Sequence, residues 1–308
     1  MASTETLPPA AAPAAPGMPE AEVLLARPRP VARGIRTFLY AATGLAFFAG
    51  AQLSLLSEQT DRYGFWPIKV PSTAAFMGAS YWATCALFLW AARQREWIRV
   101  RAAVSGGVFV TTGLLVATLD HLDQFHDRVL GVVWVEAYVI AVPAFFVVEV
   151  LQLGTPGRDR GVEQPLPPLL RWTLAAQAAL MLGFGVWLFA KSSDPSGNVW
   201  AWDLTPLTAE VVAAWLLGIG GSAAYIAWRG DRADMPGPAL SYIVLGGLWL
   251  IGAARFGGDL HTVGGVLYVV FAASVLAVGC VGSYLAWREG RFMPVRPPGG
   301  VPVELREG

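Results

Sequence analysis

Eight apolar segments, each about as long as a bilayer is thick, constrain this chain more than any other feature. They run approximately over residues 35–56, 71–92, 102–119, 129–153, 169–190, 206–228, 238–254 and 263–287. Roughly 20 mostly apolar residues are needed to cross the hydrocarbon core. Because lipid offers no hydrogen-bond partners, spans of this length are expected to be helices, which pair every backbone amide internally. The chain is 55% hydrophobic and 14% charged, whereas soluble domains have about 25% charged residues. The sequence therefore predicts an all-α polytopic membrane protein with eight transmembrane helices.

Basic residues fall unevenly on the two sides of these spans. If the N-terminus lies inside, the inner segments carry 17 of the 22 arginines and lysines and the outer segments carry five. Because such an excess marks the cytoplasmic side, we expect a multi-pass protein of the cell membrane with both termini in the cytoplasm. Disordered tails are expected over residues 1–34 and 289–308. The charges balance at 22 of each sign, so no net charge favours nucleic acid as a partner. The apolar spans predict the lipid bilayer as the partner.

The two halves of the chain are similar to each other. Residues 36–80 match residues 171–215 at eleven of 45 positions without a gap, an offset of 135. Four spans in each half return the chain to the same side of the membrane. The sequence therefore predicts two pseudo-symmetric four-helix repeats, over 35–153 and 169–288, related by an axis along the membrane normal. A cytoplasmic linker, 154–168, joins them.

The best-conserved part of this internal repeat is a tryptophan–proline–threonine motif. It reads WPIKVPSTAAFMGA from Trp66 and WDLTPLTAEVVAAWLLG from Trp202. The motif resembles one found in uncharacterised bacterial multi-pass membrane proteins, although this chain has Ala75 and Glu210 where an arginine is often seen. That resemblance implies no particular activity. Pro71 and the proline at 206 suit the first turn of a helix, and the small residues that follow permit close helix packing.

Polar residues gather in two loops that we expect on the outer side. The segment Asp120–Arg128 contains His121, Asp123 and His126, and His261 aligns with His126 at the offset of 135. Three interpretations remain open. His121, His126, His261 and Asp123 are suitable ligands for a divalent metal; His126 and His261 could hold a b-type haem or form a quinone redox site; or the loops are simply solvated.

Glu136 lies about two turns inside the fourth span, where an ionisable group usually faces the bundle interior or a water-filled cavity. Its expected partners are Arg255, His126 and His261. A pair between Asp120 and Arg255 across the axis is an alternative. Glu149 and Glu210 lie nearer helix ends and are expected to reach the interface.

No enzyme motif is present: the sequence contains no GxSxG, HExxH, CxxC or phosphate-binding glycine loop. Cys85 and Cys280 are expected to be buried small hydrophobic residues. The first functional hypothesis is a non-enzymatic transporter-like, sensing or scaffold protein with a polar outer vestibule. The vestibule would consist of Asp120, Asp123, His126, Glu136, Arg255 and His261. The alternative is a haem- or metal-binding membrane oxidoreductase that uses His126 and His261.

Overall fold

The computed structural model describes residues 27–127, 129–193 and 200–291. Most of the two predicted tails, residues 1–26 and 292–308, lies outside these ranges. Within the described residues the chain is all-helical, has no named strand, and contains eight helices long and apolar enough to cross a membrane. The predicted class is confirmed, and the chain is an integral, multi-pass membrane protein.

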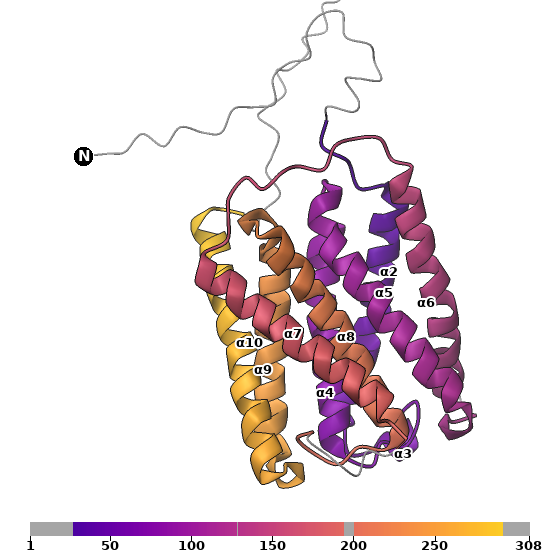
Figure 1. The fold of residues 1–308 in the computed structure, drawn as a ribbon. Coiled ribbons are helices and arrows are strands. Elements are labelled where there is room, and N and C mark those ends of the chain that lie inside the picture. The colour runs from indigo at the N-terminus through magenta and orange to yellow at the C-terminus, as the bar shows by residue number, and fades with distance from the viewer. Residues whose placement is uncertain (1–26, 128, 194–199, 292–308) are drawn as a thin grey trace, which may run out of the picture.

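The long helices follow the predicted spans closely (Figure 1). They are α2 (Arg33–Leu55), α4 (Pro71–Ala92), α5 (Trp97–Asp120), α6 (Val129–Leu153), α7 (Pro168–Ala190), α8 (Pro206–Arg229), α9 (Pro236–Arg255) and α10 (Thr262–Arg288). A short helix, α3 (Thr60–Tyr63), precedes α4. The main difference is α5, which begins five residues before the predicted span, 102–119. Its first turn carries Arg99 and Arg101, which pair with Glu96 and Asp159 at the surface.

The helices pack in the same order in both halves. Within each half the first helix lies on the second, α2 on α4 and α7 on α8, and the third lies on the fourth, α5 on α6 and α9 on α10. Between the halves, α4 packs on α9 and α5 packs on α8. The four inner helices are therefore α4, α5, α8 and α9, and the two halves interlock instead of standing as separate bundles.

Several polar contacts recur at the offset of 135. Arg36 Nε donates to the Ala92 carbonyl oxygen at 2.8 Å, and Arg171 Nε donates to the Ala227 carbonyl oxygen at 2.8 Å. The backbone bridge between Pro30 and Glu96 likewise recurs between Pro165 and Asp231. These paired contacts extend beyond residue 80, where sequence identity between the halves is lost. They support the predicted duplication, and the symmetry relating the two units stays a prediction.

The repeated motif forms a packing corner, as its residues predict. Pro71 and Pro206 each occupy the first turn of their helix. Thr205 and Thr208 form a capping box at the start of α8, which satisfies two amides that the helix leaves unpaired. Across the halves, Trp202 Nε1 donates to Thr73 Oγ1 at 2.8 Å. The motif thus joins α4 to the loop that precedes α8.

The two ends of the bundle differ in charge. One end, called the arginine-rich end here, carries residues 27–32, 93–96, 154–167, 230–235 and 289–291. Its segment 154–167 runs across the top of the molecule in Figure 1. Asp159 in this segment lies 3.6 Å from Arg29 and 3.3 Å from Arg101. The opposite end, called the loop end here, carries residues 56–70, 121–127, 200–205 and 256–261. Cys85 is buried as expected, whereas Cys280 is exposed on α10.

Candidate functional site

The six residues predicted to form an outer vestibule do not gather in one place. Asp120 and Asp123 are exposed at the end of α5, and His126 directly precedes α6. The backbone amide of His126 donates to the Phe65 carbonyl at 3.2 Å, and that of His261 donates to the Ala201 carbonyl at 2.8 Å. Each histidine loop is therefore held by the motif loop of its own half.

His126 and His261 lie at opposite edges of the bundle. His126 stands at the start of α6 and His261 caps the start of α10, and Figure 1 shows these two helices on opposite sides. The side chain of His261 lies 3.3 Å from Asp203 Oδ1. Within the described ranges no group of three His, Cys, Asp or Glu residues is close enough to hold a metal. A ligand shared by the two imidazoles has no support in this arrangement.

Arg255 and Glu136 do not contact the partners that were predicted for them. Arg255 Nη1 donates to the Ser54 carbonyl at 3.2 Å, and its Nη2 lies 3.9 Å from Glu58 Oε1. The expected pairing of Arg255 with Asp120 or Glu136 is therefore replaced by a contact with the end of α2. Glu136 is exposed on α6 instead of facing the bundle interior.

Glu210, which was predicted to reach the membrane interface, is buried instead and has closer polar partners than Glu136. Glu210 is only 6% exposed. Its Oε1 accepts a hydrogen bond from Ser192 Oγ at 2.7 Å, and its Oε2 lies 3.4 Å from His121 Nε2. Glu210 lies near the start of α8, where a long polar side chain can usually reach the membrane interface, so its position in the sequence did not indicate burial.

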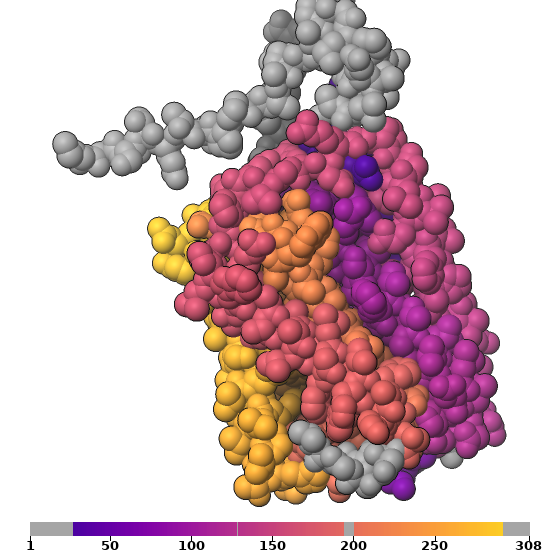
Figure 2. Space-filling view, viewed as in Figure 1, coloured from indigo at the N-terminus to yellow at the C-terminus, as the bar shows by residue number. Residues whose placement is uncertain are grey.

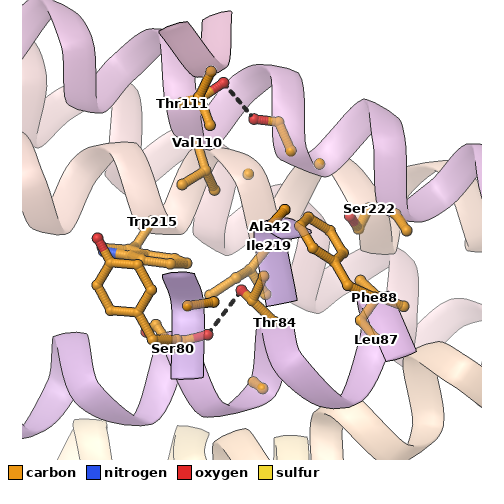
Figure 3. A pocket seen from close by; sticks show the side chains of 18 of the residues that line it. Ala42, Ser80, Thr84, Leu87, Phe88, Val110, Thr111, Trp215, Ile219 and Ser222 are labelled. Atoms are coloured by element: carbon orange, nitrogen blue, oxygen red, sulfur yellow. Dashed lines mark hydrogen bonds between the residues drawn. The ribbon is translucent and has the colours of Figure 1, made fainter. Parts of the chain in front are cut away.

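A cavity of about 420 Å³ lies between several of the spans. Its walls come from α2, α4, α5, α6 and α8, with a few residues of α9. Figure 3 labels lining side chains from α2, α4, α5 and α8. The described lining residues are apolar or hydroxyl-bearing, and none is charged. Two threonine hydroxyls of the wall are bonded to helix backbone: Thr84 Oγ1 donates to the Ser80 carbonyl at 2.9 Å, and Thr111 Oγ1 donates to the Gly107 carbonyl at 2.8 Å. The hydroxyls of Tyr81 and Tyr138 bond to each other.

This cavity opens sideways between α2 and α6. Leu45 and Phe48 on α2 and Val133 and Ile140 on α6 line the cavity, although they are 39–66% exposed. Residues that both line an internal space and reach the outer surface mark its mouth. Leu45 lies 12 residues from the start of α2, about 18 Å along the helix axis, which is near the middle of the span. The mouth is therefore at the level of the hydrocarbon core.

Toward the arginine-rich end, the same two helices meet. The rings of Phe38 on α2 and Phe145 on α6 contact each other edge to face, with centroids 4.8 Å apart. In the second half, the equivalent pair is bridged deeper in the span, where Gln177 Nε2 of α7 donates to Ser274 Oγ of α10 at 3.0 Å. The position that corresponds to Gln177 is Ala42, so this bridge cannot form in the first half.

Small side chains on α2 and α5 help to leave this space open. At the offset of 135, the α2 wall residues Ala46 and Ala49 correspond to Met181 and Phe184, and Gly107 of α5 corresponds to Tyr242. A single methylene changes core packing measurably, and these exchanges replace small residues by some of the largest apolar ones. The wall residues that α2 and α5 contribute are thus smaller than their counterparts in the second half.

Comparison with protein-family models, curated proteins and solved structures finds no match for this chain. The class that the fold defines is therefore a multi-pass membrane protein with eight candidate spans, and the uncharged cavity beside α2 and α6 is its best-formed candidate site.

Proposed function

We propose that this protein is a non-enzymatic sensing or transporter-like protein of the cell membrane, which takes an uncharged apolar ligand from the bilayer into the cavity. The observation that carries the proposal is the mouth between α2 and α6, which opens at mid-span into a space without charged lining residues. Moving a charged ligand into such a space would cost several kcal/mol or more, whereas an apolar ligand already dissolved in lipid enters without losing favourable hydration.

The distribution of basic residues supports an orientation with both chain ends in the cytoplasm. The 17 arginines and lysines predicted inside include those of the arginine-rich end, and five lie on the other side. The likeness of the repeated motif to uncharacterised bacterial membrane proteins is part of the proposal and adds no activity to it. The alternative of a haem- or metal-dependent oxidoreductase that uses both histidines has less support, because His126 lies shortly before α6 and His261 caps α10, and Figure 1 shows these two helices on opposite sides.

Photolabelling with a neutral phenyl diazirine dissolved in the bilayer tests the proposed function. Purified protein in lipid nanodiscs is irradiated, and the labelled residues are mapped by mass spectrometry. We expect label on Thr84, Val110 and Ile219, which line the cavity and are half-buried, in addition to the lipid-facing surface. Val270 on α10, which is 63% exposed, serves as the surface reference.

The matched variant carries Ala46→Met and Ala49→Phe, the residues found in the second half, and should lose label at the cavity positions while Val270 keeps it. Ala51→Val, which introduces the second-half residue at a position outside the cavity lining, is the control and should label like the wild type. Absence of cavity label in the wild type, or cavity label that survives the double substitution, contradicts the proposal.

A further inference from the structure

A second hollow lies on the outside of the bundle, where α7 meets the end of α8. This groove has a volume of about 640 Å³ and is separate from the cavity described above. It lies near the arginine-rich end, on the face seen in Figure 2, where α7 packs on α8 below the connection 154–167. Its floor is made of small residues, Ala175, Ala178 and Ala179, with Leu182 further along the helix.

The mouth of the groove combines a fixed cation with exposed indoles. Trp172 and Trp228 line it and are 73% and 71% exposed, which is typical of residues at the boundary between lipid and water. Arg171 lies between them in the lining and is exposed. The groove thus has an apolar trough that points into the membrane and a cationic head at the interface.

Arg171 is held in place with part of its guanidinium free. Its Nε donates to the Ala227 carbonyl at 2.8 Å, and its Nη2 donates to the Trp228 carbonyl at 3.2 Å. A guanidinium has five N–H donors, so Nη1 and one hydrogen of Nη2 remain for another acceptor. Among the described residues no carboxylate lies within ion-pair distance of Arg171, in contrast to the paired Arg229 and Arg232. A positioned guanidinium with free donors matches the geometry of a phosphate.

The first half has an equivalent arginine contact but larger residues beside it. Arg36 holds the Ala92 carbonyl as Arg171 holds that of Ala227. However, the floor residues Ala175 and Leu182 correspond to Tyr40 and Phe47 at the offset of 135. Tyr40 and Phe47 therefore put aromatic rings where the second half has an alanine and a leucine that line the groove. Arg36 provides a matched control, with an equivalent arginine contact beside larger side chains.

We propose that the groove between α7 and α8 binds an anionic phospholipid, with the phosphate on Arg171 and one acyl chain along Ala175, Ala179 and Leu182. Basic pockets between transmembrane helices are suited to lipid head groups. An anionic head group complements an arginine that has no acidic neighbour. A zwitterionic lipid brings a cation that this arginine repels. This site is independent of the cavity and of its ligand.

Native mass spectrometry of the detergent-purified full chain tests the proposal. The protein is titrated with dioleoyl phosphatidylglycerol, dioleoyl phosphatidylcholine and inorganic phosphate. We expect one phosphatidylglycerol to bind about tenfold more tightly than phosphatidylcholine, which corresponds to about 1.4 kcal/mol. Inorganic phosphate should not displace it, because the acyl chain in the trough contributes to binding. Equal affinity for the two lipids, or displacement by millimolar phosphate, would overturn the assignment.

Three variants locate the site. Arg171→Gln should abolish the preference for phosphatidylglycerol, and Ala175→Tyr should abolish tight binding by filling the trough with the first-half residue. Arg36→Gln removes the equivalent arginine contact, which lies beside Tyr40 and Phe47 in place of the alanine and leucine, and should bind phosphatidylglycerol like the wild type. If Arg171→Gln does not fold, Ala175→Tyr still decides the question. Equal losses in Arg36→Gln and Arg171→Gln, or normal binding by Ala175→Tyr, would place the lipid elsewhere.

Discussion

Replacing Glu210 should destabilise the fold more than replacing Glu136, although the sequence alone favours the opposite order. Glu210 is buried and accepts a hydrogen bond from Ser192, with His121 3.4 Å away, whereas Glu136 is exposed on α6. Hydrogen bonds to charged groups are worth about 1.5–3 kcal/mol, and the Ser192 hydroxyl would be left unpaired. Glu210→Ala should therefore lower the free energy of unfolding by about 3 kcal/mol.

The isosteric variant separates the two contributions to this loss. Glu210→Gln keeps an oxygen that can accept from Ser192 and removes only the charge beside His121, so we expect it to cost about 1 kcal/mol. Glu136→Ala should not lower the free energy of unfolding, because Glu136 is exposed on a membrane-spanning helix, where holding a carboxylate costs free energy.

Denaturation in detergent micelles, followed by tryptophan fluorescence with each variant at equal concentration, measures these differences. The reasoning is refuted if Glu210→Ala unfolds like the wild type, or if Glu136→Ala is the more destabilised of the two.

Three further predictions concern the ends of the bundle. Burial raises the pKa of Asp234 from 3.8 to about 6, so the folded state holds this proton more tightly than the unfolded state. The protonated carboxyl therefore contributes at most about 3 kcal/mol of stability. That contribution is present below about pH 4 and is lost as pH rises to about 6. Asp234→Asn should remove that loss, and parallel melting curves for the two proteins between pH 4 and 7 would contradict it. Arg36→Gln, which breaks the hydrogen bond to the Ala92 carbonyl, should cost about 1.5–3 kcal/mol in chemical unfolding. Arg171→Gln breaks the equivalent bond and a second one to the Trp228 carbonyl, so it should cost at least as much, and a smaller loss would contradict this reasoning. In a background without the native cysteines, a membrane-impermeant maleimide applied to intact cells should label Glu58→Cys and spare Glu163→Cys, and the reverse pattern would invert the proposed orientation.

The spans could be predicted because lipid imposes a length and a composition on each of them. The start of α5 was missed because Trp97–Arg101 combines apolar residues with two arginines that remain at the surface, and a hydropathy pattern does not distinguish such a turn from a loop. The packing of α4 on α9 and α5 on α8 could not be derived from sequence, since all eight spans have similar apolar faces.

The candidate site was harder to predict for a physical reason. A cavity results from side chains that are missing, and Ala46, Ala49 and Gly107 look like ordinary packing residues until their larger counterparts in the second half are compared with them. The polar loops drew attention because histidine and aspartate are rare in this chain. Their positions are set by hydrogen bonds to the motif loop of the same half, which separate His126 from His261.

A density map of the protein in lipid nanodiscs tests the central claim most directly. The account predicts elongated non-protein density that enters between Leu45 of α2 and Ile140 of α6 and reaches Ile219 on α8. A map in which α6 packs against α2 along their whole length, with the space between them filled by protein side chains, would contradict it.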